Sequence, residues 1–419
     1  MSPKSEIEIV IIGGGPAGST AATILAQAGR RVLVLEKEKF PRFHVGESLL
    51  PYNRRIFDGI GVWPKLEAAG FMKKRGAQFL MGNGSVALRL NFSKGSFNKY
   101  HEAIQVERSK FDEILLNHAR EAGAEVREEA LVLGCQVHAE DVTVRYREAG
   151  GGEREVRSKF LVDASGLANF TANRKALRED YPGHRKIAIF GHFAQVDMPQ
   201  GDEKGDILVV RRENSWFWLI PLEDNKTSVG LVMDCAEFQK SGRDISATFH
   251  EAVRDTPAVR DRFAHAKALD VLHVARDFSY RNRSFVEPRL VRVGDASGFI
   301  DPVFSSGVML AMAGACQGAL AVDEALSQGK GMSDGMRAYE KTNRKSLDLY
   351  WEFIESFYTR SFTQLFFQPT HRLRLVCAIS SVLVGSTELS FAIRWRLRVF
   401  FLLARLNRWV PIAQRIPVG

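Results

Sequence analysis

Cysteine is scarce in this sequence. Its 419 residues include only four cysteines, Cys135, Cys235, Cys316 and Cys377, and no two of them are close along the chain. This spacing excludes a cysteine metal clip, a redox dithiol and a disulfide-stapled scaffold. We therefore expect four reduced cysteines in the core of a cytoplasmic protein.

Long hydrophobic runs are also missing. The longest apolar stretches, such as residues 375–385, fall short of the ~20 residues that a membrane-spanning helix needs. The N-terminus passes from a short polar lead into the apolar run 7–12 without the features of a secretion signal. With no repeats or low-complexity segments, the chain is predicted to be a globular protein of two or three packed units that does not cross a membrane.

Acidic residues are nearly absent from the last part of the chain. Residues 356–419 contain nine arginines, no lysine and one acid, Glu388, which almost accounts for the net charge of +9. The spacing of Arg394, Arg398, Arg405 and Arg408 places them on one helical face, opposite apolar residues.

This face has two interpretations. It is either the solvated side of an amphipathic helix packed on the body of the protein, or a docking surface. A docking surface of this charge suits an acidic partner such as an acyl carrier protein, or an anionic membrane surface to which the protein would be peripheral. Nucleic acid is not expected, because no reader motif is present.

A glycine-rich turn follows the first apolar run. Gly13, Gly15 and Gly18 lie between a strand and a helix of small residues, and Glu36 closes the next apolar run. In this context the glycines allow a tight turn, a close approach to a pyrophosphate and close packing of the helix on the strand. The acid can accept hydrogen bonds from ribose hydroxyls, which favours FAD or NAD over a 2′-phosphorylated cofactor. Ala17 and Lys37 belong to the same predicted binding surface.

The order of elements predicts two sheets. The opening is a βαβ unit with a parallel sheet, and a helix is expected over 109–122 with Ser109 as its cap. Alternating strands over 187–233 predict a second, antiparallel sheet, and 289–294 reads as a strand that returns to the first one. We predict a discontinuous nucleotide domain (1–175 and 281–330), a substrate-binding sheet domain (176–280, with a hairpin around 79–105) and a helical, arginine-rich C-terminal region (331–419).

Two distant segments identify the cofactor by resemblance. The sequences at 106–112 (VERSKFD) and 294–298 (GDASG) resemble fingerprints of the p-hydroxybenzoate hydroxylase-like flavoproteins. The resemblance implies the α/β, two-domain FAD-binding fold of the glutathione reductase-like and p-hydroxybenzoate hydroxylase-like proteins, with a mixed antiparallel substrate sheet and a C-terminal helical appendix. It assigns Asp295 to the flavin ribityl chain and Arg108 to the neighbourhood of the cofactor.

Two further motifs resemble those of flavin-dependent halogenases. The loop 40–51 (FPRFHVGESLLP) is similar to a loop of these enzymes and of geranylgeranyl reductases, and implies cofactor contacts at Glu47 and Ser48. Without this resemblance the segment reads only as an ordered loop, with His44 as a structural histidine. Residues 214–221 (NSWFWLIP) contain W-x-W-x-I-P, which in this family separates flavin from substrate. On a strand, Trp216, Trp218 and Ile220 share one face, with Pro221 next to them; the alternative is an ordinary core face.

The segment 299–307 (FIDPVFSSG) completes a second halogenase pattern, F-x-x-P-x-x-S-x-G, before a helix expected over 308–326. The resemblance implies that Ser306 and Gly307 hold halide, that Pro302 and Gly307 contact the flavin, and that Phe304 and Ser305 belong to the partition. Backbone amides at a helix start are natural anion donors. Simple capping by serine is the alternative, and the two are compatible.

Residues 71–77 (FMKKRGA) resemble the halogenase segment F-x-x-K-x-G-A. In that family the lysine either hydrogen-bonds hypohalous acid or becomes a chloramine, and Lys74 is the matching position. Because Lys73, Lys74 and Arg75 are consecutive, a plain basic surface and Lys73 as the functional residue remain open.

The sequence departs from the family at two places. Tryptophan halogenases have a glutamate where this chain has Phe304, so an electron-rich phenol or pyrrole is a better substrate prediction than tryptophan. The hydroxylases have an Asp-Gly motif where this chain has Asp163-Ala164-Ser165-Gly166, which weakens the case for direct use of NADPH.

Together the motifs predict a halogenase of secondary metabolism that uses FADH2 from a separate reductase. O2 would form a flavin hydroperoxide, chloride or bromide would be oxidised, and Lys74 would deliver hypohalous acid to a free or carrier-bound aromatic substrate. The alternatives are a flavin-dependent reductase or monooxygenase acting on a polyketide or isoprenoid, and a catalytically silent flavin-binding scaffold. No metal site is expected.

Overall fold

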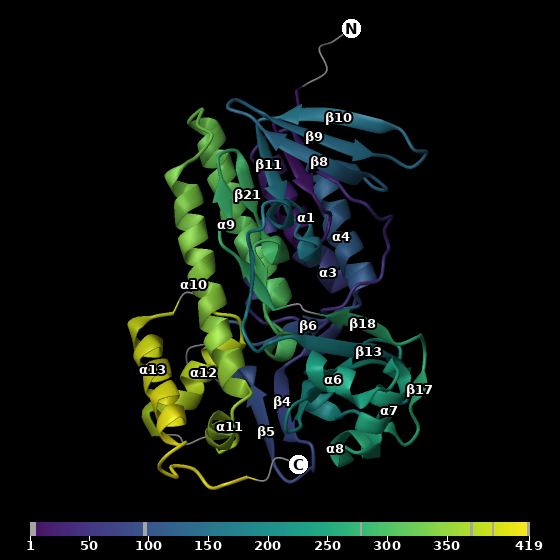
Figure 1. The fold of residues 1–419 in the computed structure, drawn as a ribbon, viewed down its shortest axis with the longest axis vertical. Coiled ribbons are helices and arrows are strands. Elements are labelled where there is room, and N and C mark those ends of the chain that lie inside the picture. Colours follow the sequence, from purple (N-terminus) through teal and green to yellow (C-terminus); the bar gives the residue numbers. More distant parts are fainter. Residues whose placement is uncertain (1–5, 95–98, 277–278, 369–371, 388, 417–419) are drawn as a thin grey trace.

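Two sheets organise the fold, one in the upper half and one in the lower half of the molecule as drawn (Figure 1). The computed structural model describes residues 6–94, 99–276, 279–368, 372–387 and 389–416. The first sheet, with strand order β20-β21-β11-β1-β2-β7, is parallel except at β20. Its strands are β1 (Ile9–Ile12), β2 (Val32–Leu35), β7 (Glu125–Arg127), β11 (Phe160–Asp163), β20 (Val286–Glu287) and β21 (Leu290–Arg292).

The short strands β1, β2 and β11 are buried on both faces, which explains why they read as continuous apolar runs. Ile9 and Ile11 face the helices α1 (Pro16–Gln27), α4 (Arg108–Glu121) and α9 (Gly307–Ser327). Val10 and Ile12 face a three-stranded antiparallel layer of β8 (Leu131–Val137), β9 (Val142–Arg147) and β10 (Glu153–Ser158). Alternate side chains of these strands therefore pack against two different layers, one on each face of the sheet.

One detail of α4 differs from the sequence prediction. The helix begins at Arg108, one residue before Ser109, and its N-cap Glu107 makes no side-chain capping bond. The Arg108 guanidinium reaches Asp112 one turn later, with Nε to Oδ1 at 2.7 Å, and this pair stabilises the first turn of the helix. The expected serine cap was therefore wrong, and the hydroxyl of Ser109 donates instead to the Glu107 carboxylate.

The second sheet is larger and mostly antiparallel, in the order β17-β13-β16-β15-β14-β4-β5, with β18 also pairing with β13. Only the β14–β4 pair is parallel, so the hairpin β4–β5 joins the sheet at its far edge. Its strands are β4 (Gly76–Met81), β5 (Ala87–Asn91), β13 (Lys186–Ala194), β14 (Ile207–Arg211), β15 (Trp216–Pro221), β16 (Lys226–Asp234), β17 (Lys267–Ala268) and β18 (His273–Arg276).

The two faces of this sheet have different partners. Phe217 and Leu219 of β15 pack with α7 (Ile245–Arg254) and α8 (Pro257–Arg260) in a separate apolar cluster. Trp216, Trp218 and Ile220 belong to the opposite face, which is continuous with the main core. The period of two along the strand therefore turns the W-x-W-x-I residues toward the first sheet and the C-terminal helices.

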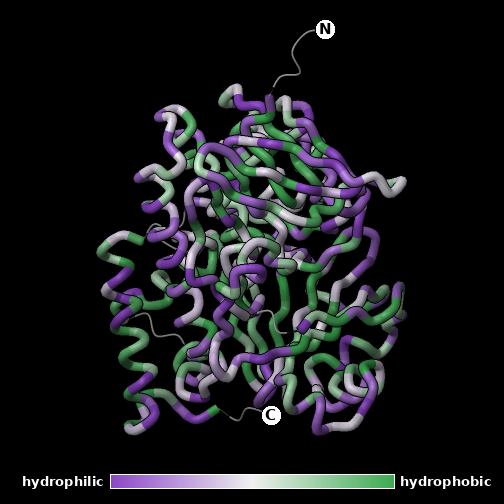
Figure 2. Tube along the Cα trace, turned by 45° about the horizontal axis from the view of Figure 1, so that its top comes forward, coloured by the Kyte–Doolittle hydropathy of each residue, from purple (hydrophilic) through white to green (hydrophobic). Residues whose placement is uncertain are grey.

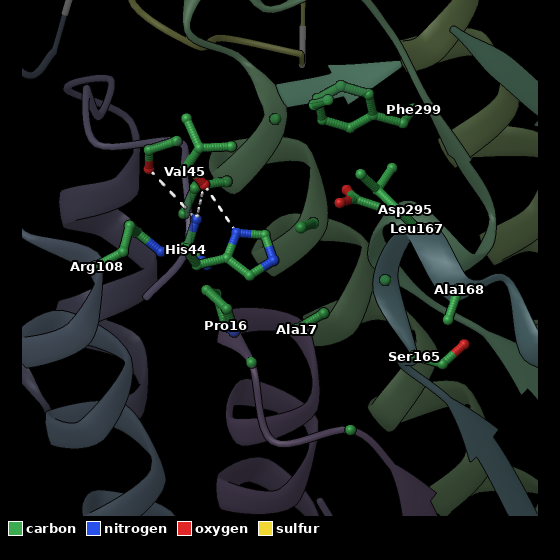
Figure 3. Close-up of a pocket in the computed structure, with 18 of the residues that line it drawn as sticks. Pro16, Ala17, His44, Val45, Arg108, Ser165, Leu167, Ala168, Asp295 and Phe299 are labelled. Atoms are coloured by element: carbon green, nitrogen blue, oxygen red, sulfur yellow. Dashed lines mark hydrogen bonds between the residues drawn. The ribbon is translucent and has the colours of Figure 1, made fainter. Parts of the chain in front are cut away.

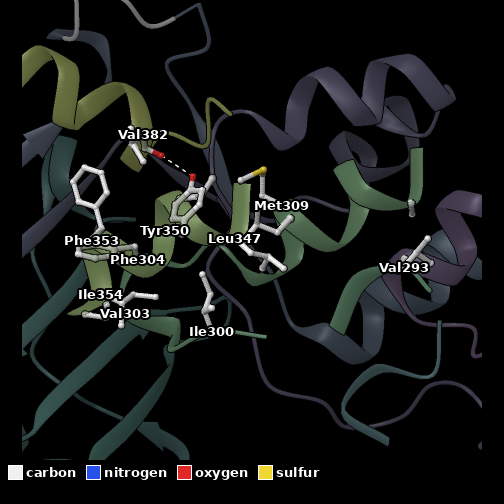
Figure 4. Packing of buried hydrophobic residues seen from close by; sticks show 14 of the residues in the cluster. Val293, Ile300, Val303, Phe304, Met309, Leu347, Tyr350, Phe353, Ile354 and Val382 are labelled. Atoms are coloured by element: carbon white, nitrogen blue, oxygen red, sulfur yellow. Dashed lines mark hydrogen bonds between the residues drawn. The ribbon is translucent and has the colours of Figure 1, made fainter. Parts of the chain in front are cut away.

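The C-terminal helices connect the two sheets. They are α10 (Asp334–Phe357), α11 (Arg360–Phe367), α12 (Leu375–Leu383) and α13 (Phe391–Leu406). The long α10 runs beside α9 and ends among the rings that cover the second sheet (Figure 1). Figure 4 shows Phe353 and Ile354 of α10 packed on Val303 and Phe304, while the Tyr350 hydroxyl donates to the carbonyl of Val382 at 2.7 Å.

Shorter elements complete the connections. They are α2 (Asn53–Ile60), α3 (Trp63–Ala68), β3 (Met72–Lys74), β6 (Ala103–Gln105), α5 (Phe170–Arg174), β12 (Arg178–Asp180), α6 (Cys235–Ser241), β19 (Tyr280–Asn282) and β22 (Gly298–Phe299). Apolar segments gather in the interior and hydrophilic ones on the outside (Figure 2).

One helix, α9, is long and apolar enough to cross a membrane by length and composition alone. The sequence analysis did not single it out. Most of its apolar window is buried inside the protein, between α1 and α10, as expected for the core helix of a globular protein. The four cysteines are free, and the described part of the chain brings together no cluster of histidine, cysteine and acidic residues suited to a metal.

Candidate functional site

A cavity of about 390 Å³ lies where the first sheet meets the second. Helix starts, the loop 42–48 and the face of β15 all contribute to it, and Figure 3 shows Pro16 and Ala17 of α1 on one side and Asp295 and Phe299 on another. The predicted residues that line it are Gly13, Gly15, Ala17, Glu36, Lys37, Glu47, Ser48, Arg108, Trp216, Trp218, Ile220, Asp295, Pro302, Ser305 and Gly307.

Five predicted residues are not part of this lining: Gly18, Lys74, Pro221, Phe304 and Ser306. Gly18 acts through packing, because a Cβ there would lie 1.9 Å from the carbonyl oxygen of Gly13. Phe304 lies beyond the wall, among the rings of Phe353 and Phe357. The structure thus separates residues that face the cavity from residues that shape it.

The glycine turn has the geometry of a dinucleotide site. Gly13 has φ +97°, and a Cβ there would lie 2.5 Å from the carbonyl oxygen of Ala164. The buried Glu36 carboxylate accepts from the backbone N–H of Gly14 (2.7 Å) and of Glu38 (2.9 Å). Each of its oxygens keeps lone-pair capacity for ribose hydroxyls, so these residues fit the adenosine end of FAD.

A cationic cluster lines the cavity beside the glycine turn. Arg108 pairs with the fully buried Asp112, and Arg42 reaches the same carboxylate with Nη1 to Oδ2 at 3.2 Å. Arg108 also donates to the carbonyl of Val45 at 2.6 Å, which fixes the loop above α1 (Figure 3). The loop 42–48 is therefore held by charge, and Arg42 stands near Gly15, where a pyrophosphate would lie.

Asp295 faces the cavity from the turn that follows β21 (Figure 3). Burial raises the pKa of its carboxyl group to about 7, against the opposing influence of Arg108. A ribityl chain that donated hydroxyl hydrogen bonds to Asp295 would stabilise the charged form. The residue fits the role that the Gly-Asp motif assigned to it.

Several lining residues were missed in the sequence. His44 was interpreted as structural, yet it lines the cavity, and burial lowers its pKa to about 4. Its Nδ1 lies 3.0 Å from the carbonyl oxygen of Val45. Ser165 and Leu167, next to the unusual Asp-Ala-Ser-Gly segment, also line the cavity. The sequence signal that could have revealed these two residues is their position directly after β11, because ligands bind at the carboxyl edge of a parallel sheet.

A second missed feature links the cofactor loop to the larger sheet. Nε2 of His192 lies 2.8 Å from Oε1 of Glu47, and Nδ1 lies 3.0 Å from Oδ2 of Asp270. Although burial lowers the pKa of His192, the two carboxylates outweigh it and raise the pKa overall. Because only the protonated ring donates through both nitrogens, a charged His192 best fits this arrangement.

The tryptophan wall is held by long-range hydrogen bonds. Nε1 of Trp216 donates to the hydroxyl of Tyr358 at 2.9 Å, and that hydroxyl donates to Oδ2 of Asp301 at 2.7 Å. Gly230 leaves room for the Trp218 indole, since a Cβ there would lie 2.2 Å from its ring. Burial raises the pKa of Asp301 to about 6. The wall is thus fixed by the 299–307 segment and by the residue that follows α10.

The 299–307 segment ends in a strained turn before α9. Ser305 has φ +56°, which is unusual for a serine, and Ser306 is buried as the first residue before the helix. Within the described residues, the Ser306 hydroxyl has no hydrogen-bond partner. The Ser306 hydroxyl therefore does not cap α9. It can donate a hydrogen bond to a ligand near Gly307, which lies at the edge of the cavity.

Lys73 and Lys74 occupy very different environments. Lys73 is exposed and lies 3.4 Å from the Glu102 carboxylate, whereas Lys74 is only 1% exposed. Nζ of Lys74 donates to Oγ of Ser48 (2.8 Å) and to the carbonyl of Leu49 (2.9 Å). Burial lowers the pKa of Lys74 to about 7, although the charge of Asp206 opposes this.

Comparison with known proteins agrees with the geometry. Residues 6–349 match the FAD binding domain family, and the fold and cavity together define an FAD-dependent flavoenzyme. The chain belongs to the flavin-dependent halogenases within that family. The expected two-domain FAD-binding fold and halogenase resemblance are confirmed.

Two sequence relatives illustrate the similarity. The 1H-pyrrole-2-carbonyl-(peptidyl-carrier protein) chlorinase of Pseudomonas fluorescens is 31% identical over 395 residues, 88% of each chain. The tryptophan 2-halogenase of Chondromyces crocatus is 32% identical over 364 residues, 85% of this chain and 69% of that one.

Solved structures give the same result. The flavin-dependent brominase Bmp2 superposes with a TM-score of 0.85 at 26% identity, covering 96% of this chain and 100% of that one. A flavoprotein/dehydrogenase from Cytophaga hutchinsonii superposes with a TM-score of 0.89 at 25% identity, covering 96% and 99%. These matches extend through the C-terminal helices, beyond the span of the family match.

Proposed function

We propose that this protein halogenates an electron-rich aromatic ring, a phenol or a pyrrole, and that Lys74 delivers the halogen. The observation that carries the proposal is the placement of Lys74: a buried amine tied to Ser48, a residue that lines the flavin cavity. FADH2, supplied by a separate reductase, provides with O2 the oxidising power that converts halide to hypohalous acid. The chain's own residues position, shield and pass on that product.

The hydrogen bonds of Lys74 favour one protonation state for this role. A neutral amine has two N–H groups, and the Ser48 hydroxyl and the Leu49 carbonyl accept both of them. Its lone pair is then free to bind the hypohalous acid. In the transfer, the ring C–H bond is replaced by a carbon–halogen bond, and the released proton leaves with hydroxide as water.

Chloride or bromide would be held at the start of α9. The unpartnered Ser306 hydroxyl and the backbone N–H of Gly307 supply donors, and the helix start favours an anion. Trp216 and Trp218 then form the partition that keeps the organic substrate out of the flavin cavity. Phe304 lies on the substrate side of this partition, where it offers no charge to a cationic ring intermediate, in line with a phenol or pyrrole acceptor.

The test is a reconstituted reaction with FAD, a flavin reductase, NADH and bromide over a panel of phenols, pyrroles and carrier-bound pyrrolyl groups. Brominated product that requires bromide supports halogenation. A hydroxylated or hydrogenated product that forms without halide would instead support the monooxygenase or reductase alternative. Bound flavin without any product would favour a scaffold.

The pH dependence of turnover tests the state of Lys74. Because the neutral amine is the active form and its pKa is about 7, the rate of bromination should rise as the pH increases through about 7. Asp206→Asn removes the charge that holds this pKa up, so the rising limb should move to lower pH. Glu102→Gln, next to Lys73 instead, serves as the control and should leave the profile unchanged. A profile that falls with increasing pH would contradict the neutral-amine role.

We further propose that α13 docks an acidic carrier protein that presents the substrate. Arg394, Arg398 and Arg405 of α13 are exposed, while Phe400 and Phe401 are buried against the body. Arg408 is also exposed, but it lies in the turn after α13 and not on the predicted helical face. Two relatives act on pyrrolyl groups attached to carrier proteins. Opposite charges steer such encounters and weaken with salt.

Charge reversal on α13 tests the docking proposal. Arg398→Glu with Arg408→Glu should raise the KM for a carrier-bound substrate about tenfold or more and leave free phenols unaffected. The exposed residues Lys240 of α6 and Lys267 of β17 give the matched control, Lys240→Glu with Lys267→Glu. Equal KM values for both double variants would reject docking. Sedimentation with vesicles of anionic lipid examines the membrane alternative, and binding lost only by the α13 variant would favour a lipid surface instead.

A further inference from the structure

Among the described residues, one buried arginine lacks a counter-charge. Four arginines of this part of the chain are no more than 7% exposed, and three of them, Arg108, Arg289 and Arg292, form ion pairs with carboxylates. The fourth is Arg211 at the end of β14, which is 1% exposed and forms none. Its Nε and Nη1 atoms are buried without a hydrogen-bond acceptor in the same part of the chain. Because a buried, uncompensated charge is costly, we expect Arg211 to have a partner from outside these residues.

Large apolar side chains lie around Arg211. It is the register partner of Trp216 in β15 and of Met81 in β4, and both are at most 1% exposed. The ring of Phe357, at the end of α10, has its centroid 5.0 Å from the guanidinium carbon. A ring face compensates a buried cation only in part. The site is therefore apolar apart from the guanidinium itself.

The charged and polar groups close to Arg211 are already engaged. The carboxylate of Glu213 pairs with the exposed Arg360. The hydroxyl of Tyr358 accepts from one indole of the tryptophan wall and donates to Asp301. Burial lowers the pKa of Arg211 to about 10, so the side chain is still a cation at neutral pH. The missing partner is therefore an anion.

A helix start lies beside this cation. Helix α11 begins at Arg360, three residues after Phe357, whose ring contacts Arg211. The first N–H groups of a helix have no partner within the helix, and its positive end favours an anion. The start of α11 therefore adds to the attraction that the buried guanidinium exerts.

The chemistry of these groups indicates a small monovalent anion. Guanidinium and backbone N–H groups are donors only, so the ligand must be an acceptor. One buried cation balances one negative charge, whereas a divalent anion such as sulfate would keep a buried, unpaired charge. A halide ion meets both conditions and needs no room for a carbon skeleton between Trp216 and Met81.

We propose that Arg211 binds a halide ion at a site separate from the one proposed at Ser306 and Gly307. Arg211 is not part of the lining of the flavin cavity. This inference goes beyond the proposed function, because the ion is not oxidised here: it is the counter-ion that allows the end of β14 to pack against residues 357–360. Since Trp216 is the register partner of Arg211 and donates to Tyr358, the ion also stabilises the tryptophan wall.

Melting temperatures test the proposal. The FAD-loaded protein is measured in sodium bromide and, at equal ionic strength, in sodium gluconate, whose anion carries a carbon skeleton. Arg211→Met removes the buried charge and keeps an extended side chain. In gluconate this variant should melt no lower than the wild type, because it loses an uncompensated charge. Bromide should raise the Tm of the wild type by about 2 °C or more relative to that of the variant.

Arg212→Met is the matched control. Its guanidinium donates to Oγ of Ser215, with Nη1 to Oγ at 3.2 Å, so it has a partner in the chain. The Tm of this variant should respond to bromide as that of the wild type does. All three proteins keep the flavin-side halide site, so binding there cancels from the comparison. Equal responses of Arg211→Met and the wild type, or a lower Tm of Arg211→Met in gluconate, would overturn the proposal.

A crystal of the FAD-loaded wild type soaked in bromide locates the ion. We expect an anomalous peak against the Arg211 guanidinium. Bromide found only at the start of α9, or a peak at Arg211 without any stabilisation by bromide in solution, would overturn the proposal, the second because it would mean an adventitious ion only. This experiment needs no variant, so it decides even where Arg211→Met does not fold.

Discussion

Replacing Lys74 by methionine should reduce bromination by about 10²- to 10⁴-fold, the range typical for loss of a positioned acid–base group. Methionine has a similar length and is tolerated in apolar surroundings, so the buried position is kept without its amine. Flavin binding and the consumption of O2 and NADH should persist, because Lys74 does not line the flavin cavity. Product analysis, together with oxygen uptake, measures the two effects separately.

The matched control for this variant is Lys73→Met. Lys73 is exposed, and its contact with Glu102 is of the kind that contributes little in water. Its loss should change turnover by less than about twofold. Equal losses in the two variants would mean that the basic run acts only through its overall charge, and full activity in Lys74→Met would reject a lysine-delivered halogen.

Glu36→Ala should raise the dissociation constant for FAD about 100-fold, which corresponds to ~2.7 kcal/mol. The carboxylate accepts from the backbone N–H groups of Gly14 and Glu38 and is placed to accept from the ribose. Alanine removes the ribose contacts, a loss that costs about 1–3 kcal/mol in binding. It also leaves the buried N–H of Gly14 unpaired, which loosens the turn that receives the cofactor. Titration of the apoprotein with FAD, followed by flavin fluorescence, gives the constant directly.

Glu36→Gln serves as the comparison for this second prediction. Its amide oxygen can still accept one of the backbone bonds, so its affinity for FAD should fall between those of the wild type and Glu36→Ala. Excess FAD should restore turnover in both variants, because the damage is to binding and not to the halogen transfer. An unchanged dissociation constant in Glu36→Ala would place the adenosine elsewhere.

Motifs whose residues follow one another along the chain could be recognised in the sequence. The glycine turn, Glu36, and the halogenase motifs each contain neighbours whose spacing carries the signal, and most of their members line one cavity. The sequence alone could not show which of Lys73 and Lys74 is buried. This depends on β3 pairing with β6, which turns one side chain outward and the other inward.

Contacts between distant segments were not predictable. The chain Trp216–Tyr358–Asp301 joins three segments, and the Glu47–His192–Asp270 contacts join three others. Each residue alone has an ordinary local setting, so no pattern marks it. A smaller cavity between β5 and the C-terminal helices has the same origin, because only tertiary packing brings its walls together.

The bond from Trp216 to Tyr358 changes how the last part of the chain should be regarded. A protein shortened after α9 would lose the acceptor of the Trp216 indole, the donor to Asp301 and the rings that cover the larger sheet. The C-terminal helices therefore hold the tryptophan wall in place, and they would be a structural part of the barrier that we propose between oxidant and substrate. Family members could change acceptor preference by replacing these helices, while leaving the nucleotide end of the enzyme untouched.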